Sequence, residues 1–105
     1  MRTVPLLIGM VAFVGCGRPV SYAEARAVVN RRCIQCHSDR PTSRAFPLAP
    51  QGIKLDTALQ MKQYARRIGA TVAVDRTMPI ANMTGMTDEE RRVLGRWAET
   101  AAKLP

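Results

Sequence analysis

Five consecutive residues, Cys33-Ile34-Gln35-Cys36-His37, constrain this chain more than any other stretch. They read C-x-x-C-H, which is the spacing of covalent c-type haem attachment. Two thiols three positions apart can reach the two vinyl groups on one edge of a porphyrin and form thioethers with them. The imidazole next in line then meets the iron from one face of the ring. We therefore predict one covalent haem c, attached through Cys33 and Cys36, with His37 as the proximal iron ligand.

Two other interpretations of the motif stay open at this point. A C-x-x-C pair can be a thioredoxin-like dithiol, but that motif is expected in a βαβ context, and no strand-rich stretch flanks it here. A structural zinc site needs four ligands, most often Cys and His. The chain has three Cys and one His, so a zinc site would need a carboxylate or Cys16 to complete it. Both alternatives predict a colourless protein.

The composition suits a cofactor-filled core. One hundred and five residues allow one domain. Aromatic residues make up only 5% of the chain, so side chains alone give a small domain a marginal core. A haem would supply a large flat apolar surface for short helices to pack around. We expect the chain without haem to be poorly folded.

The formal net charge is +8. Several basic residues stand in separate pairs, at 31–32, 66–67 and 91–92, and no run of five like charges occurs. We interpret these pairs as solvated helix faces and predict no nucleic-acid partner. A basic rim around the haem edge would also steer docking onto redox partner proteins with an acidic surface.

Residues 1–16 have the pattern of an export signal, with a basic start and an apolar run from Val4 to Val14. Gly15-Cys16 after this run resembles a bacterial lipoprotein signal, in which Cys16 would be acylated and become the mature N-terminus. An ordinary cleaved signal is the alternative. We predict a short linker at 17–20 and a protein on the periplasmic side of a bacterial membrane, anchored through Cys16 or soluble.

Helix signals occur through much of the remaining sequence, residues 21–105. Ser21 and Glu24 form a capping box before an apolar stripe that leads straight into Cys33. Asp56 is the predicted N-cap of a second helix that Gly69 would end. Thr87 and Glu90 form another capping box, which opens a last helix with Trp97 in its core. We predict an all-α domain of three to four helices around the haem.

Residues 38–54 hold three prolines and a glycine, which exclude a long helix. So long a loop inside a small domain is expected to be functional. We predict that it wraps one edge of the haem, with Phe46, Pro47 and Leu48 as the residues that pack against the ring.

Residues 77–86 carry three methionines, and a thioether from this loop is the predicted distal iron ligand. Met78 is favoured, because Pro79 biases it to an extended backbone that can point sideways into a ring. Met83 is the main alternative. Met61 lies inside a predicted helix, and Met86 directly precedes the predicted cap Thr87.

The order helix, C-x-x-C-H, long loop, helix, methionine loop and capped last helix resembles a class I monohaem cytochrome c. Three stretches resemble the C-terminal cytochrome c domain of bacterial membrane-bound urate oxidases (urate hydroxylases): 33–42, 46–57 and 78–91. The family's multi-helix membrane module is missing from this chain. The resemblance implies a class I cytochrome c fold, a haem carrier and a separate urate-oxidising membrane enzyme as a candidate partner.

Residue chemistry thus favours a one-electron carrier over an enzyme. A haem with histidine and methionine on the iron has both axial positions filled, which suits electron transfer. The alternative is a haem protein with an open iron position, such as a peroxidase or a gas sensor. The sixth ligand discriminates between them.

Overall fold

The computed structural model describes residues 3, 5 and 18–104, and the regular elements in this part of the chain are all helical. The prediction of an all-α fold is confirmed, with four α-helices among these residues. Cys16 and most of the predicted export signal lie outside the described residues. Three short 3-10 or π segments join the α-helices, in the order α1 (Tyr22–Arg32), η1 (Pro50–Gly52), α2 (Ala58–Gln63), α3 (Ala65–Ile68), η2 (Gly69–Val74), η3 (Ile80–Asn82) and α4 (Asp88–Ala101).

Helix α1 begins and ends as its sequence predicts. The Glu24 N–H donates to Ser21 Oγ at 3.1 Å, and the Ser21 N–H donates to the Glu24 carboxylate at 2.9 Å, so both halves of the capping box form. Ala25, Val28 and Val29 are buried on one face. Cys33 is the C-cap, and the haem motif therefore starts where the helix stops.

The second predicted helix differs from the structure in three ways. Its N-cap is Thr57, in a capping box with Gln60, whereas Asp56 lies outside the helix. The helix is interrupted at Tyr64, whose ψ of 10° separates α2 from α3. Gly69 does not end it, because Gly69 keeps right-handed helical angles and the chain continues into the π-helical segment η2.

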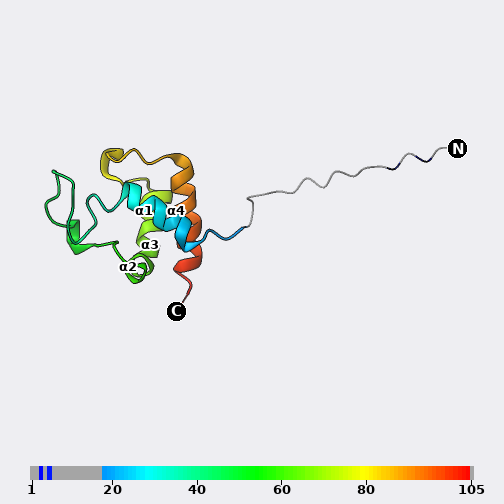
Figure 1. Cartoon of the computed structure of the whole chain (residues 1–105), viewed down its shortest axis with the longest axis horizontal. Helices are drawn as coiled ribbons and strands as arrows, with labels where there is room; N and C mark the ends of the chain where they lie inside the picture. Colours follow the sequence, from blue (N-terminus) through cyan, green and yellow to red (C-terminus); the bar gives the residue numbers. More distant parts are fainter. Residues whose placement is uncertain (1–2, 4, 6–17, 105) are drawn as a thin grey trace.

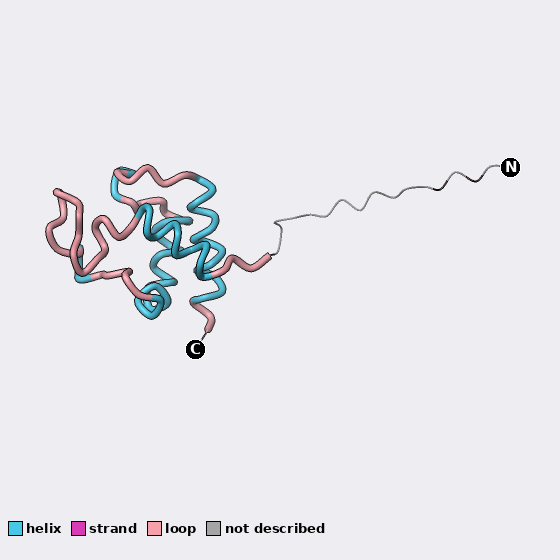
Figure 2. Tube along the Cα trace, viewed as in Figure 1, coloured by secondary structure: helices cyan, strands magenta, loops and turns pink. Residues whose placement is uncertain are grey.

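Helix α4 is the element against which the others pack. Thr87 and Glu90 cap it as predicted, and it contacts α1, α3 and η2 (Figures 1 and 2). Trp97 is 6% exposed, which confirms its place in the core. The core cluster is built from α1, α2, α3, η2, α4 and the segments that precede α2 and α4: Ala25, Val28, Val29, Leu55, Met61, Ala65, Ile68, Val72, Met86, Leu94, Trp97, Ala98 and Ala101.

A glycine lets α4 and η2 approach closely. A Cβ added at Gly95 would lie 2.7 Å from the Cβ of Ala73, which is too close for two carbon atoms. Gly69 meets α4 in a similar way, since its added Cβ would lie 3.1 Å from the Cβ of Ala98. The small residues therefore set the distance between these two segments.

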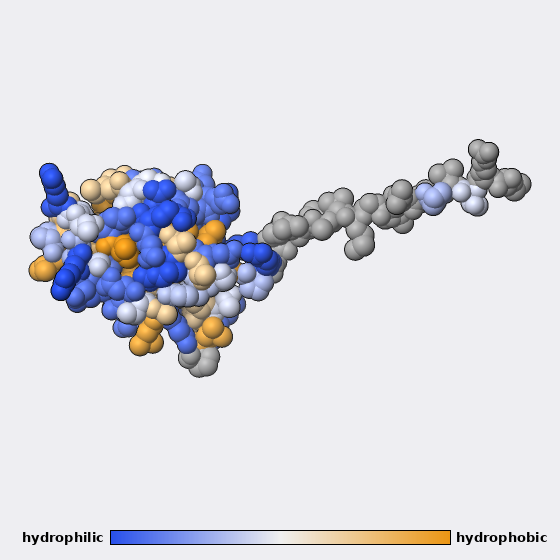
Figure 3. All heavy atoms as spheres, in the orientation of Figure 1, coloured by the Kyte–Doolittle hydropathy of each residue, from blue (hydrophilic) through white to orange (hydrophobic). Residues whose placement is uncertain are grey.

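The visible face of the domain is mainly hydrophilic, with small separate hydrophobic areas (Figure 3). Among the described residues, none of the helices has the length and apolar character needed to cross a membrane.

Candidate haem-binding cavity

A cavity lies where the end of α1, the loop 38–54, the α3–η2 region and the methionine loop meet. Its empty volume is about 880 Å³, a figure that includes open solvent at its mouth. Six of the residues singled out in the sequence line it: Cys33, Cys36, His37, Phe46, Met78 and Met83. Apolar side chains from the helical elements, such as Ile68 and Val72, form much of the remaining wall.

Not every predicted site residue reaches this cavity. Pro47 and Leu48 follow Phe46 in the chain but are not part of the wall, and Leu48 is 79% exposed. The structure therefore supports Phe46 alone among the three residues expected to pack against the ring.

The four candidate methionines differ in whether they line the cavity and in how exposed they are. Met61 and Met86 are buried in the core, at 0% and 4% exposure, and neither lines the cavity. Met78 and Met83 do line it, but Met83 is 60% exposed whereas Met78 is half-buried. Met78 is the more enclosed of the two thioethers.

The two motif cysteines are held by the turn that follows α1. The Cys33 N–H donates to the Val29 carbonyl at 2.9 Å, and the His37 N–H donates to the Cys33 carbonyl at 2.9 Å. Both thiols are free. Burial raises the pKa of the Cys33 thiol to about 12, and the nearby Cys36 and the Glu90 carboxylate act in the same direction.

The dithiol interpretation expects strands beside the motif, and the regular elements of the described residues are all helical. Within residues 18–104, no group of three or more His, Cys, Asp or Glu side chains is arranged to hold a metal ion.

The imidazole of His37 is oriented by a backbone carbonyl. Its Nδ1 lies 2.9 Å from the Ile53 oxygen, so an Nδ1–H donated to this carbonyl leaves the lone pair of Nε2 available for a metal. The Leu55 N–H donates to the His37 carbonyl at 2.9 Å, which ties the returning end of the loop to the motif. The role of Ile53 is carried by its backbone, so the amino-acid sequence contains no signal for it.

Asp56 closes the loop instead of capping a helix. Its carboxylate accepts hydrogen bonds from the Ser38 hydroxyl and the Asp39 N–H, both at 2.8 Å. Arg26 of α1 donates to the carbonyls of Leu55, at 2.7 Å, and Asp56, at 3.0 Å. The loop 38–54 is thereby fixed at the residues that follow it.

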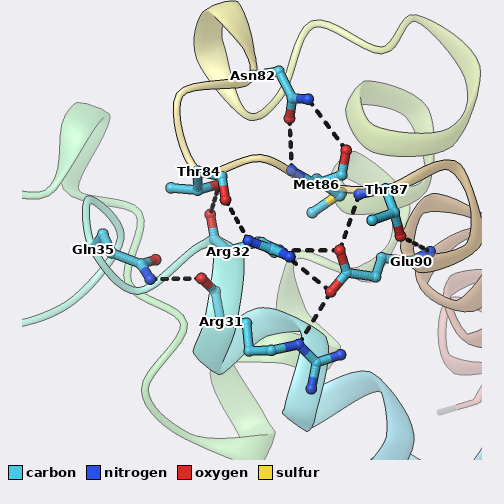
Figure 4. A network of polar contacts seen from close by, with 8 residues as sticks. All are labelled: Arg31, Arg32, Gln35, Asn82, Thr84, Met86, Thr87 and Glu90. Carbon is cyan, nitrogen blue, oxygen red and sulfur yellow. Dashed lines mark hydrogen bonds and ion pairs between the residues drawn. The ribbon is translucent and has the colours of Figure 1, made fainter.

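Glu90 of α4 joins the end of α1 to the methionine loop (Figure 4). Its carboxylate accepts from the guanidinium groups of Arg31, at 3.1 Å, and Arg32, at 3.0 Å. Arg32 also donates to the Thr84 carbonyl, and the Thr84 hydroxyl donates back to the Arg32 carbonyl at 2.8 Å. Arg32 and Thr84 both line the cavity, so this network fixes one of its rims.

The pKa of Glu90 follows from these contacts. Its burial would raise the pKa of the carboxyl, but hydrogen bonds from the Thr87 amide and from Arg31 and Arg32 outweigh this effect. Together they lower the pKa of Glu90 to about 2. The carboxylate is therefore ionised at neutral pH and pairs with two cations.

The prediction that the basic pairs lie on solvated helix faces is wrong for two of the arginines. The side chain of Arg32 is 26% exposed, and Arg91 is 7% exposed. Arg91 donates to the carbonyls of Val72 and Met78. The pair at 91–92 does not reveal from sequence which member is buried, because the neighbouring Arg92 is exposed.

Comparison with known proteins gave no match: no protein-family model, no curated protein and no solved structure is similar to this chain at a significant level.

The residues on the cavity fit a covalent haem. Two thiols, an imidazole held through Nδ1 and a half-buried thioether face one largely apolar space. These are the groups that haem attachment and His/Met ligation require.

Proposed function

We propose that this protein is a one-electron carrier with a single covalent haem c in this cavity. The observation that supports the proposal best is that Cys33, Cys36, His37 and Met78, which are separated by up to 45 positions (78 − 33), line one cavity. Cys33 and Cys36 would hold the ring by thioethers. His37 and Met78 would fill the two axial positions of the iron.

The haem, when bound, supplies a reversible one-electron couple whose potential is raised by methionine ligation. The residues of the chain would keep water away from it and hold its ligands. Ile53 orients His37, and the apolar side chains of α3 and η2 cover part of the cavity. A protein with this arrangement transfers electrons without binding a substrate at the iron.

The proposal extends to the partners and the location. The net charge of +8 suits redox partner proteins with an acidic docking surface. The resemblance to the cytochrome domain of urate oxidases suggests a separate urate-oxidising membrane enzyme as electron donor. We propose that the protein lies on the periplasmic side of a bacterial membrane, either anchored by lipid at Cys16 or soluble.

A redox titration of the purified holoprotein tests electron transfer against an open iron site. We expect a single transition with one electron per haem, and no change in the spectrum of the ferrous protein when carbon monoxide is added. Rapid stoichiometric binding of carbon monoxide to the wild-type protein would instead favour a ligand-binding or peroxidase-like haem.

A further inference from the structure

Arg91 is a buried cation. It lies in the first turns of α4, is 7% exposed, and takes part in none of the ion pairs among the described residues. Within the same residues, its Nε has no hydrogen-bond partner. Burying a charged side chain without a counter-ion costs free energy, so an apolar residue of similar volume would serve packing better. Packing alone therefore does not explain why a guanidinium group is buried at this position.

The side chain of Arg91 donates hydrogen bonds to backbone carbonyls of and near the predicted distal ligand, Met78. One terminal nitrogen donates to the Met78 carbonyl at 2.7 Å and to the Val72 carbonyl at 3.0 Å. The Met78 N–H donates to the Thr71 carbonyl at 3.1 Å. Both polar backbone atoms of Met78 are thus fixed to a frame made by α4 and η2, and Thr71, Val72 and Met78 all line the cavity.

We propose that Arg91 is a positioning residue for Met78, an inference that rests on the proposed function. A methionine side chain is flexible, so its sulfur stays in place only if the backbone that carries it is held. Groups that hydrogen-bond to ligand residues orient them and tune the metal. A charged donor gives stronger hydrogen bonds to carbonyl oxygens than a neutral one, which accounts for a cation at this buried position.

Three variants of the haem-loaded protein separate this role from general stability. Arg91→Met removes both hydrogen bonds and keeps most of the volume. Arg91→Lys keeps the charge but has a single nitrogen with another geometry. Arg92→Met is the matched control, because it makes the same charge change at the adjacent, exposed position.

The readouts are the charge-transfer band of the ferric iron–thioether bond, the affinity of the ferric protein for imidazole, and the helix content by circular dichroism. For Arg91→Met we expect at least half of the band to be lost and the imidazole affinity to rise about tenfold, consistent with the loss of charged hydrogen bonds. Arg91→Lys should lie between Arg91→Met and the wild type. Arg92→Met should match the wild type, and all variants should keep their helix content.

The inference is overturned if Arg91→Met keeps the wild-type band and imidazole affinity. It is also overturned if both Arg91 variants lose helix content together with the band, since that result shows a general structural role. A wild-type protein that never shows the band contradicts the proposed function as well. A wild-type band that persists in Arg91→Met contradicts only the role of Arg91.

Discussion

At the scale of single residues, burial helps to decide whether Met78 or Met83 is the candidate distal iron ligand. Both lie on the cavity, but Met83 is 60% exposed, and only Met78 has its carbonyl bonded to the buried Arg91. We expect Met78→Ala to abolish the charge-transfer band of the ferric protein, to lower the reduction potential and to open the iron to small ligands. Met83→Ala is the matched control and should keep the band. The reverse pattern would assign the distal position to Met83.

Glu90 makes stability depend on pH in the acidic range. Its pKa is lowered to about 2 from an ordinary 4.5, so its stabilising effect is fully present above pH 4.5 and is lost as the pH falls through 2. The shift corresponds to about 3 kcal/mol of unfolding free energy, of which roughly half is lost by pH 3.

The matching experiment compares urea unfolding of wild-type and Glu90→Gln holoprotein at pH 6 and pH 3. Gln can still complete the capping box with Thr87, so the variant removes chiefly the charge. We expect the difference in unfolding free energy to shrink at pH 3. Glu89→Gln, at an exposed neighbouring position, should show little difference at either pH. If the difference in unfolding free energy between the wild type and Glu90→Gln is equal at both pH values, that result would contradict the shifted pKa.

At the scale of elements, the sequence predicts the N-termini of α1 and α4 correctly. The signals at Ser21 and Thr87 are local, since each cap and its partner lie three residues apart. The second helix was less predictable, because Asp56 bonds to Ser38 and Asp39, which are distant in sequence. The positions of Cys33, Cys36 and His37 follow from one motif, whereas the roles of Ile53 and Arg91 depend on tertiary contacts that no spacing encodes.

The packing of α4 on η2 gives a prediction at the level of elements. Ala favours a helix over Gly by about 1 kcal/mol, but a Cβ at position 95 would lie 2.7 Å from Ala73. We expect the overpacking cost of about 1–3 kcal/mol to outweigh this gain, so that Gly95→Ala destabilises the holoprotein by up to about 2 kcal/mol in urea unfolding. Glu99→Ala, at an exposed position of α4, is the control and should have little effect. A Gly95→Ala protein that is more stable than the wild type by about 1 kcal/mol, the full propensity gain, would show that the segments can separate at no cost.

At the scale of the whole molecule, the described residues form a small helical domain in which short helices and two loops surround one cavity. The core cluster is formed mainly by short helices, and the cavity between them and the two loops has thiol, imidazole and thioether groups on its wall. On the proposed function, a domain of this size with few aromatic residues would gain much of its burial from the ring of a bound haem. The chain without haem should therefore show reduced helix content and a weak, broad unfolding transition.

Covalent attachment is the central claim, and intact mass combined with the visible spectrum measures it most directly. The chain is expressed with a cytochrome c maturation system, beside the Cys33→Ser/Cys36→Ser double variant as control. We expect the wild-type protein to be coloured, to have a c-type spectrum and to gain the mass of one haem under denaturing conditions, whereas the double variant gains none. A colourless wild-type protein at the mass of its polypeptide, or equal haem attachment in the double variant, would contradict this claim.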